Sequence, residues 1–135
     1  DNLPDDNVRY FTAVVRPSPR ILVAASEPTA AHAAYFTQAI AGRELQINGI
    51  APYEVLTQSF DKLATEELSN YGAVILLDPP GLPDAAWQQI EAYARRGGGV
   101  AIFLGAAAQP TVMNGPIAQG VLAGKLGIQA RYPQG

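Results

Sequence analysis

The chain has 135 residues, of which 48% are hydrophobic, and its 9 basic and 12 acidic residues give a net charge of -3. This length supports one hydrophobic core, and the composition is that of a folded domain, not of a disordered segment. A nucleic-acid partner is not expected, because phosphate binding requires clustered basic residues and Arg95-Arg96 is the only adjacent pair. The absence of cysteine excludes disulfides, thiolate nucleophiles and Cys-ligated metals.

The sequence also carries neither a membrane-spanning segment nor a recognisable signal peptide. No apolar run approaches the roughly 20 residues that span a bilayer, and the acidic residues 1–6 are unlike a signal peptide. We therefore expect no direct membrane insertion of this segment. Because it starts on Asp1 without a Met and ends on Gly135, we expect it to be part of a longer polypeptide.

The amino-terminal region is predicted to contain one strand and a linker. Residues 8–15 alternate side chains between two faces, which indicates a strand. Pro17 and Pro19 then prevent regular structure. We therefore predict an edge strand, or part of a neighbouring domain, in residues 1–16, a linker in residues 17–20, and an α/β domain in residues 21–135.

Within that domain, short continuous apolar runs indicate strands that are buried on both faces of a parallel sheet. The predicted strands are residues 21–25, 53–57, 73–77 and 100–104. Helical spacing of apolar residues predicts helices between them. These are a helix with Ala33, Phe36 and Ile40 on one face, a short turn around residues 60–68, a helix from Pro83 to the Arg95-Arg96 pair with Gly97 as its left-handed cap, and a last helix over residues 116–126 with Gly127 as its cap.

This alternation predicts an α/β fold. Right-handed crossovers would place helices on both faces of the sheet and give a three-layer, doubly wound, flavodoxin-like parallel sheet with strand order 2-1-3-4. The amino-terminal strand is extra to that pattern.

Candidate binding residues follow from this topology, because ligands of such sheets bind beyond the carboxyl ends of the strands. Those ends carry Ser26, Glu27, Asp78 and Gly105, to which we add Asn114 from the loop that follows. Glu27 and Asp78 could hold a cation or divide acid and base roles. Alternatively, Glu27 is favoured in a first helical turn by the helix dipole, and Asp78 accepts backbone donors in the proline-rich turn at residues 79–81.

Two further features have structural explanations. The glycine run at residues 97–99 closes a helix and leads into a strand, so it lies at the end of the sheet opposite to a phosphate-binding loop. His32 is the only histidine, and neither a metal site nor a catalytic triad can be built from it alone. We expect no metal and no cofactor.

Residues 71–78, 82–83, 90–93 and 97–105 together resemble the class I glutamine amidotransferase-like domain of bacterial membrane proteins that also carry a BatA-type segment and often a von Willebrand factor A domain. Residues 5–10 resemble the last strand of the β-sandwich that precedes that domain, and residues 114–127 resemble the loop and helix that follow it. Catalytic relatives carry a nucleophilic Cys on a tight elbow, assisted by a later His. Here Phe103 occupies that position and no His follows, so the resemblance implies a non-catalytic homologue.

Residues 76–80 also resemble the phosphoacceptor strand of response-regulator receivers. Receivers need an acidic pair after the first strand, where this chain has Glu27 alone, and a hydroxyl after the fourth, where it has Gly105 or Ala106.

The resemblance implies a non-enzymatic binding or scaffold module of a larger bacterial envelope protein. Its partners would be proteins or other domains of the same polypeptide, and it would lie in the cell envelope as part of a membrane-anchored protein. The alternative is a degenerate receiver-like phosphoacceptor or cation-binding domain centred on Asp78 and Glu27.

Overall fold

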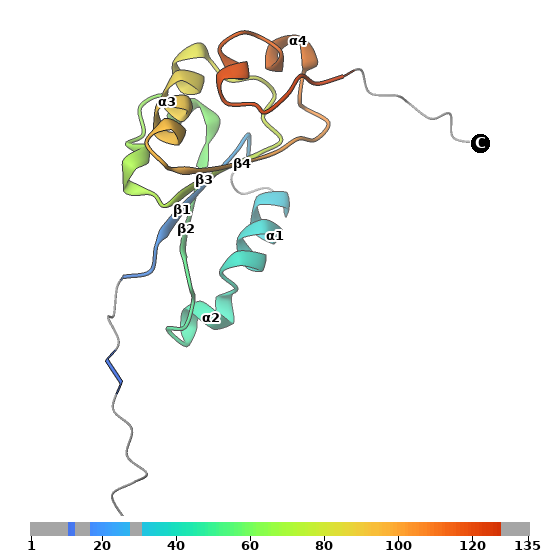
Figure 1. Ribbon diagram of the computed structural model, residues 1–135. Coiled ribbons are helices and arrows are strands. Elements are labelled where there is room, and N and C mark those ends of the chain that lie inside the picture. Colours follow the sequence, from blue (N-terminus) through green and yellow to red (C-terminus); the bar gives the residue numbers. More distant parts are fainter. Residues whose placement is uncertain (1–10, 13–16, 28–30, 128–135) are drawn as a thin grey trace, which may run out of the picture.

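The computed structural model describes residues 11–12, 17–27 and 31–127. Figure 1 shows a parallel sheet with helical segments on both of its faces. In chain order the elements are β1 (Arg20–Ala25), α1 (Ala31–Ile40), α2 (Arg43–Ile47), β2 (Glu54–Ser59), the 3-10 turns η1 (Phe60–Lys62) and η2 (Leu68–Asn70), β3 (Ala73–Leu77), α3 (Asp84–Arg95), β4 (Gly99–Phe103), α4 (Pro110–Met113) and the 3-10 turn η3 (Ala118–Gly120).

The sheet has four parallel strands in the order β2-β1-β3-β4, which confirms the predicted topology. Apolar runs form its centre because each central strand is covered on both faces. Leu22 of β1 and Val74 of β3 are register partners, and both side chains are fully buried. The predicted strand spans are confirmed to within two residues, and that of β3 agrees at both ends.

The helix α3 covers one face of the sheet. Its apolar stripe buries Trp87, Ile90 and Tyr93 against β1 and β3, and the Tyr93 hydroxyl donates to the Tyr71 carbonyl at 2.9 Å. Gly97 has a φ of 91°, which is the predicted left-handed cap. The spacing of apolar residues and the cap therefore predicted this helix correctly.

The helix α1 covers part of the opposite face, where it is drawn in cyan in Figure 1. Ala33 is buried, and Phe36 and Ile40 pack against a small cluster of Ile21, Val23 and Ile75, as their helical spacing predicts. The short helix α2 follows directly and was not predicted. It contributes no buried residue, so its sequence carries no apolar stripe to reveal it.

The predicted last helix is wrong. Residues 116–126 contain only the short turn η3, and the preceding helix α4 lies where a loop was expected. Gly120 and Gly124 interrupt the apolar pattern and disfavour a helix. Gly120 also approaches α3 so closely that an added Cβ would lie 2.8 Å from the Glu91 carboxylate. The apolar side chains of this segment still pack against the α3 side of the sheet, but from a loop.

The amino-terminal boundary also differs from the prediction by one residue, because Arg20 belongs to β1 and not to the linker. The predicted strand at residues 8–15 falls mostly outside the described residues, and Phe11 and Thr12, which are described, belong to no helix or strand. Within the described part of the chain, no helix is long and apolar enough to cross a membrane.

Candidate functional site

The carboxyl ends of β1, β3 and β4 open into a cleft of about 630 Å³. Four of the five predicted site residues line it, because parallel strands bring their carboxyl ends to one edge of a sheet. The residues that line the cleft are Ala25, Ser26, Glu27, His32, Ala33, Leu77, Asp78, Phe103, Leu104, Gly105, Ala106 and Ala107.

Asp78 links the carboxyl end of β3 to that of the edge strand β4. Its backbone N–H donates to the Phe103 carbonyl at 2.8 Å. Its carboxylate accepts from the Gly105 N–H at 3.0 Å and from the Ala107 N–H at 3.0 and 3.1 Å. Asp78 thus accepts backbone donors, but they come from the loop after β4 and not from the predicted turn at residues 79–81.

The backbone of Asp78 is unusual as well. Its φ is 50°, in the left-handed region, and among the described residues it is the only one other than glycine with a positive φ. Aspartate is one of the few residues that enter this region at modest cost, since its short side chain can hydrogen-bond locally. The hydrogen bonds from the loop after β4 therefore hold both the Asp78 side chain and the strained backbone that follows β3.

Gly105 permits this arrangement for a steric reason. A Cβ at this position would lie 2.6 Å from Cγ of Asp78, which is closer than non-bonded carbon atoms approach in proteins. The glycine thus allows the carboxylate to reach the loop backbone. We assign Gly105 a structural role in shaping the cleft.

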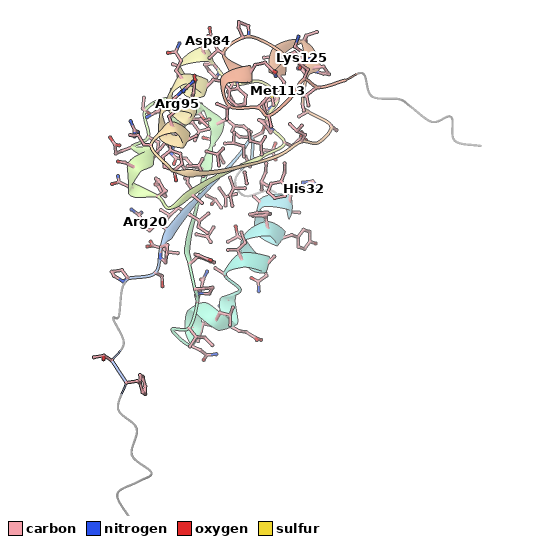
Figure 2. The ribbon with its side chains drawn as sticks, viewed as in Figure 1. Arg20, His32, Asp84, Arg95, Met113 and Lys125 are labelled. Carbon is pink, nitrogen blue, oxygen red and sulfur yellow. The ribbon has the colours of Figure 1, made fainter. Side chains whose placement is uncertain are left out.

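The polar rim of the cleft consists of Ser26, Glu27 and His32, all of which are exposed. Figure 2 shows His32 at the amino-terminal end of α1. His32 was not among the predicted site residues, although its position one short loop after the end of β1 was a signal for it. Among the residues that the structure describes, no group of three or more His, Cys, Asp or Glu side chains could hold a metal ion.

The apolar part of the cleft centres on Phe103 and Leu104, residues that are 51% and 46% exposed. The Phe103 ring meets the Phe36 ring edge to face, with the centroids 5.3 Å apart. Such an arrangement favours the contact beyond simple burial. Exposed apolar side chains beside a hollow are typical of a binding surface.

Asn114, the fifth predicted site residue, does not line the cleft. Its side chain donates to the Leu126 carbonyl at 2.9 Å and accepts from the Leu126 N–H at 2.7 Å. These bonds close the loop that replaces the predicted last helix. Asn114 therefore acts within that loop and apart from the cleft.

A polar network outside the cleft shows shifted pKa values. Glu66 accepts from the Tyr71 hydroxyl at 2.7 Å and from the Gln58 amide at 3.0 Å, and these bonds lower the pKa of Glu66. Burial and the bond to Glu66 raise the pKa of Tyr71. The network ties β2 to the segment that precedes β3.

The cleft thus combines an apolar floor, an exposed polar rim and a central carboxylate that is held by backbone donors. Comparison of the chain with protein-family models, with curated proteins and with solved structures gives no significant match. What the domain does must therefore be inferred from this geometry.

Proposed function

We propose that the domain is a non-catalytic binding or scaffold module within a larger bacterial envelope protein. Its cleft would receive an apolar group from a protein partner or from another domain of the same polypeptide. The observation that carries this proposal is the state of Asp78, whose carboxylate is occupied by the backbone N–H groups of Gly105 and Ala107.

The hydrogen bonds to Asp78 argue against a chemical role. A hydrogen bond to a charged acceptor contributes about 1.5–3 kcal/mol. Phosphoryl transfer to Asp78, or binding of a cation there, would compete with these bonds and with the contact to Gly105, and would open the loop after β4. A carboxylate that maintains the fold in this way is poorly suited to be a nucleophile.

The elbow position also supports a binding role. Phe103 ends β4 at the point where catalytic relatives of the resembled family carry a Cys, and its ring offers neither a thiolate nor a hydroxyl. Its exposed ring and that of Leu104 suit an aliphatic or aromatic side chain of a partner. The rim residues Ser26, Glu27 and His32 could add polar contacts around it.

The binding proposal can be tested by titrating the isotope-labelled protein with N-acetyl amino-acid amides. We expect the Phe and Leu derivatives to shift the amide signals of Gly105 and Ala107, and the Glu and Lys derivatives to leave them unchanged. Phe103→Ala should weaken this binding by about tenfold, the loss expected for one aromatic contact. Tyr35→Ala is the matched control, because Tyr35 is an exposed aromatic residue of α1 outside the cleft.

If the charged derivatives bind in preference, or if Tyr35→Ala weakens binding as much as Phe103→Ala does, the proposed apolar cleft is wrong. Absence of catalysis needs a separate assay. Incubation with glutamine and with general amide and ester substrates should give no turnover above background. Turnover that Ser26→Ala or His32→Ala abolishes would contradict a non-catalytic module.

The alternative of a receiver-like or cation-binding domain is favoured by one observation, which is that Glu27 and Asp78 line the same cleft. Under this alternative, magnesium with a small phosphodonor should raise the melting temperature, since a ligand of the folded state stabilises it. The rise should be absent in Asp78→Asn. We expect no magnesium-dependent shift, and a loss of about 1 kcal/mol in stability on the substitution.

A further inference from the structure

The two edges of the sheet differ in how they are protected. β2 carries Glu54, Thr57 and Gln58, whereas the sequence of β4 is GVAIF, without a polar side chain or a proline. Proteins usually protect an open edge with charges, prolines or bulges, because its backbone can pair with another chain. β4 has no such protection among its own residues.

The direction of the β4 backbone groups that have no partner among the described residues can be deduced from one hydrogen bond. The Phe103 carbonyl accepts from Asp78 across the β3–β4 ladder. Residues along a strand direct their backbone groups alternately to the two sides, so Phe103 and Ala101 face β3. Val100 and Ile102 therefore direct their N–H and C=O groups to the open edge.

A second copy of the chain, related by a two-fold axis at Ala101, matches these groups in register. The two β4 strands would run antiparallel, with Val100 of each copy opposite Ile102 of the other. Residues in such a pair exchange both of their backbone hydrogen bonds. The register therefore satisfies every outward group of Val100 and Ile102.

The same register is complementary in shape on the α1 side of the sheet. It places Gly99 of one copy opposite Phe103 of the other, as a closely spaced pair without hydrogen bonds. Phe103 is half exposed, and Gly99 has no side chain, so the ring of one copy can cover the backbone of the other. Aromatic residues beside a strand glycine stabilise edges in this way.

On the opposite side of the sheet, a groove of about 440 Å³ runs beside β4. It is lined by aliphatic residues and glycine, and no residue of β3 lines it, so it lies on the edge side of β4. The second copy would bring its own Val100 and Ile102 next to this groove. The lining residues are Ala94, Gly98, Val100, Ile102, Val121, Leu122 and Ala123.

The distribution of charge also favours the antiparallel dimer, although both copies are negatively charged. Each chain carries a net charge of -3, yet the β4 strand itself is uncharged. The two-fold axis directs the carboxyl-terminal end of α3, where Arg96 is exposed, toward the end of the other sheet that carries the exposed Glu27. Opposite charges brought toward one another in this way guide association and fix register.

We propose that the β4 edge is an interface between two copies of this chain. The two β4 strands would pair antiparallel and join the two sheets into one continuous sheet. A five-residue strand is about 17 Å long. The resulting contact is smaller than the roughly 800 Å² per partner of a standard stable interface. We therefore expect a weak dimer, whose population depends on protein concentration.

Sedimentation velocity over increasing protein concentration tests this proposal. We expect a shift from monomer to dimer that Val100→Pro abolishes, because proline removes an outward N–H and leaves the β3–β4 ladder intact. Val100→Ala is the matched control, since it shortens the side chain and keeps that N–H. It should retain the dimer.

Hydrogen exchange of the unmodified chain provides a second measurement that does not depend on the folding of a variant. Protection of the Val100 and Ile102 amides should increase with concentration. The Glu54 N–H donates to the Pro19 carbonyl of the β1 side, so Val55 and Thr57 direct their amides to the other edge and serve as internal controls. A monomer at all concentrations, a dimer that survives Val100→Pro, or concentration-dependent protection at Val55 and Thr57 instead would each overturn the proposal.

Discussion

The two faces of the sheet differ in how much of the core they carry. Among the residues that the structure describes, the face covered by α3 and the loop segments holds a cluster of fifteen buried residues, whereas the face covered by α1 holds a cluster of three. Figure 1 shows the same asymmetry, with α3 and α4 on one side of the sheet and α1 on the other. Stability is therefore concentrated on the α3 face, and the less covered α1 face leaves Phe103 exposed for contacts.

Substitution of one aromatic residue on each face gives the largest expected effects. Trp87→Ala should lower the free energy of unfolding by about 3–5 kcal/mol, because the ring is almost fully buried and leaves a cavity. Phe36→Ala should cost only about 1–2 kcal/mol, since Phe36 is partly exposed. Urea unfolding measures both values. Equal losses would show that the α1 face contributes as much as the α3 face.

A second prediction concerns the cleft at the carboxyl ends of β1, β3 and β4. Gly105→Ala should cost about 1–3 kcal/mol, because its Cβ displaces the Asp78 carboxylate and leaves the backbone donors of the loop unpaired. Gly124→Ala is the matched control, since no atom lies within 4 Å of its added Cβ. Combined with Asp78→Asn, the Gly105→Ala loss should be less than additive. Full additivity would show that Gly105 and the Asp78 carboxylate contribute to stability independently of each other.

The loop that covers the α3 face allows a smaller and more local test. Asn114→Ala should cost about 1–2 kcal/mol by removing both hydrogen bonds to the Leu126 backbone. Asn114→Asp keeps the acceptor and should lose less. Hydrogen exchange should report the change first at the Leu126 amide. Equal protection in both variants would mean that apolar contacts alone hold the loop.

The smallest effect is expected from the polar network around Glu66. The folded state lowers the pKa of this carboxyl group, so its contribution to stability is complete above the ordinary value of 4.5 and is lost as the pH falls through the lowered value. The melting temperature of the native chain should therefore decrease with acid over this range, and Glu66→Gln should reduce that dependence. Because the carboxylate is largely solvated, the change is modest. If the melting temperature of Glu66→Gln decreases with acid as much as that of the native chain, Glu66 does not contribute to this pH dependence.

Much of the fold was predictable because its signals are local. The apolar run at Ala73–Leu77 and the amphipathic stripe that ends at Gly97 each identify an element without knowledge of its neighbours. The strand order then follows from the short right-handed crossovers. The segment at residues 116–126 was misassigned because its apolar spacing resembles that of a helix, although Gly120 and Gly124 disfavour one and Gly120 lies against the Glu91 side chain.

The candidate site divides in the same way. That Ser26, Glu27, Asp78 and Gly105 converge was predictable, since each follows a strand of one parallel sheet. The role of each of these residues was not predictable. Asp78 finds its donors 27 and 29 residues further along the chain, and Asn114 finds its partner 12 residues away.

The sequence by itself thus determined the layers, the strand order and the edge of the sheet at which polar residues gather. These features depend on periodicity and on the handedness of the chain, which are properties of neighbouring residues. The tertiary structure decided that Asp78 binds the backbone of a distant loop, that Phe103 is exposed beside the cleft and that β4 is an edge strand of the sheet formed by the described residues. Hydrogen-bond partners and burial depend on which distant segments meet, and no local pattern specifies that.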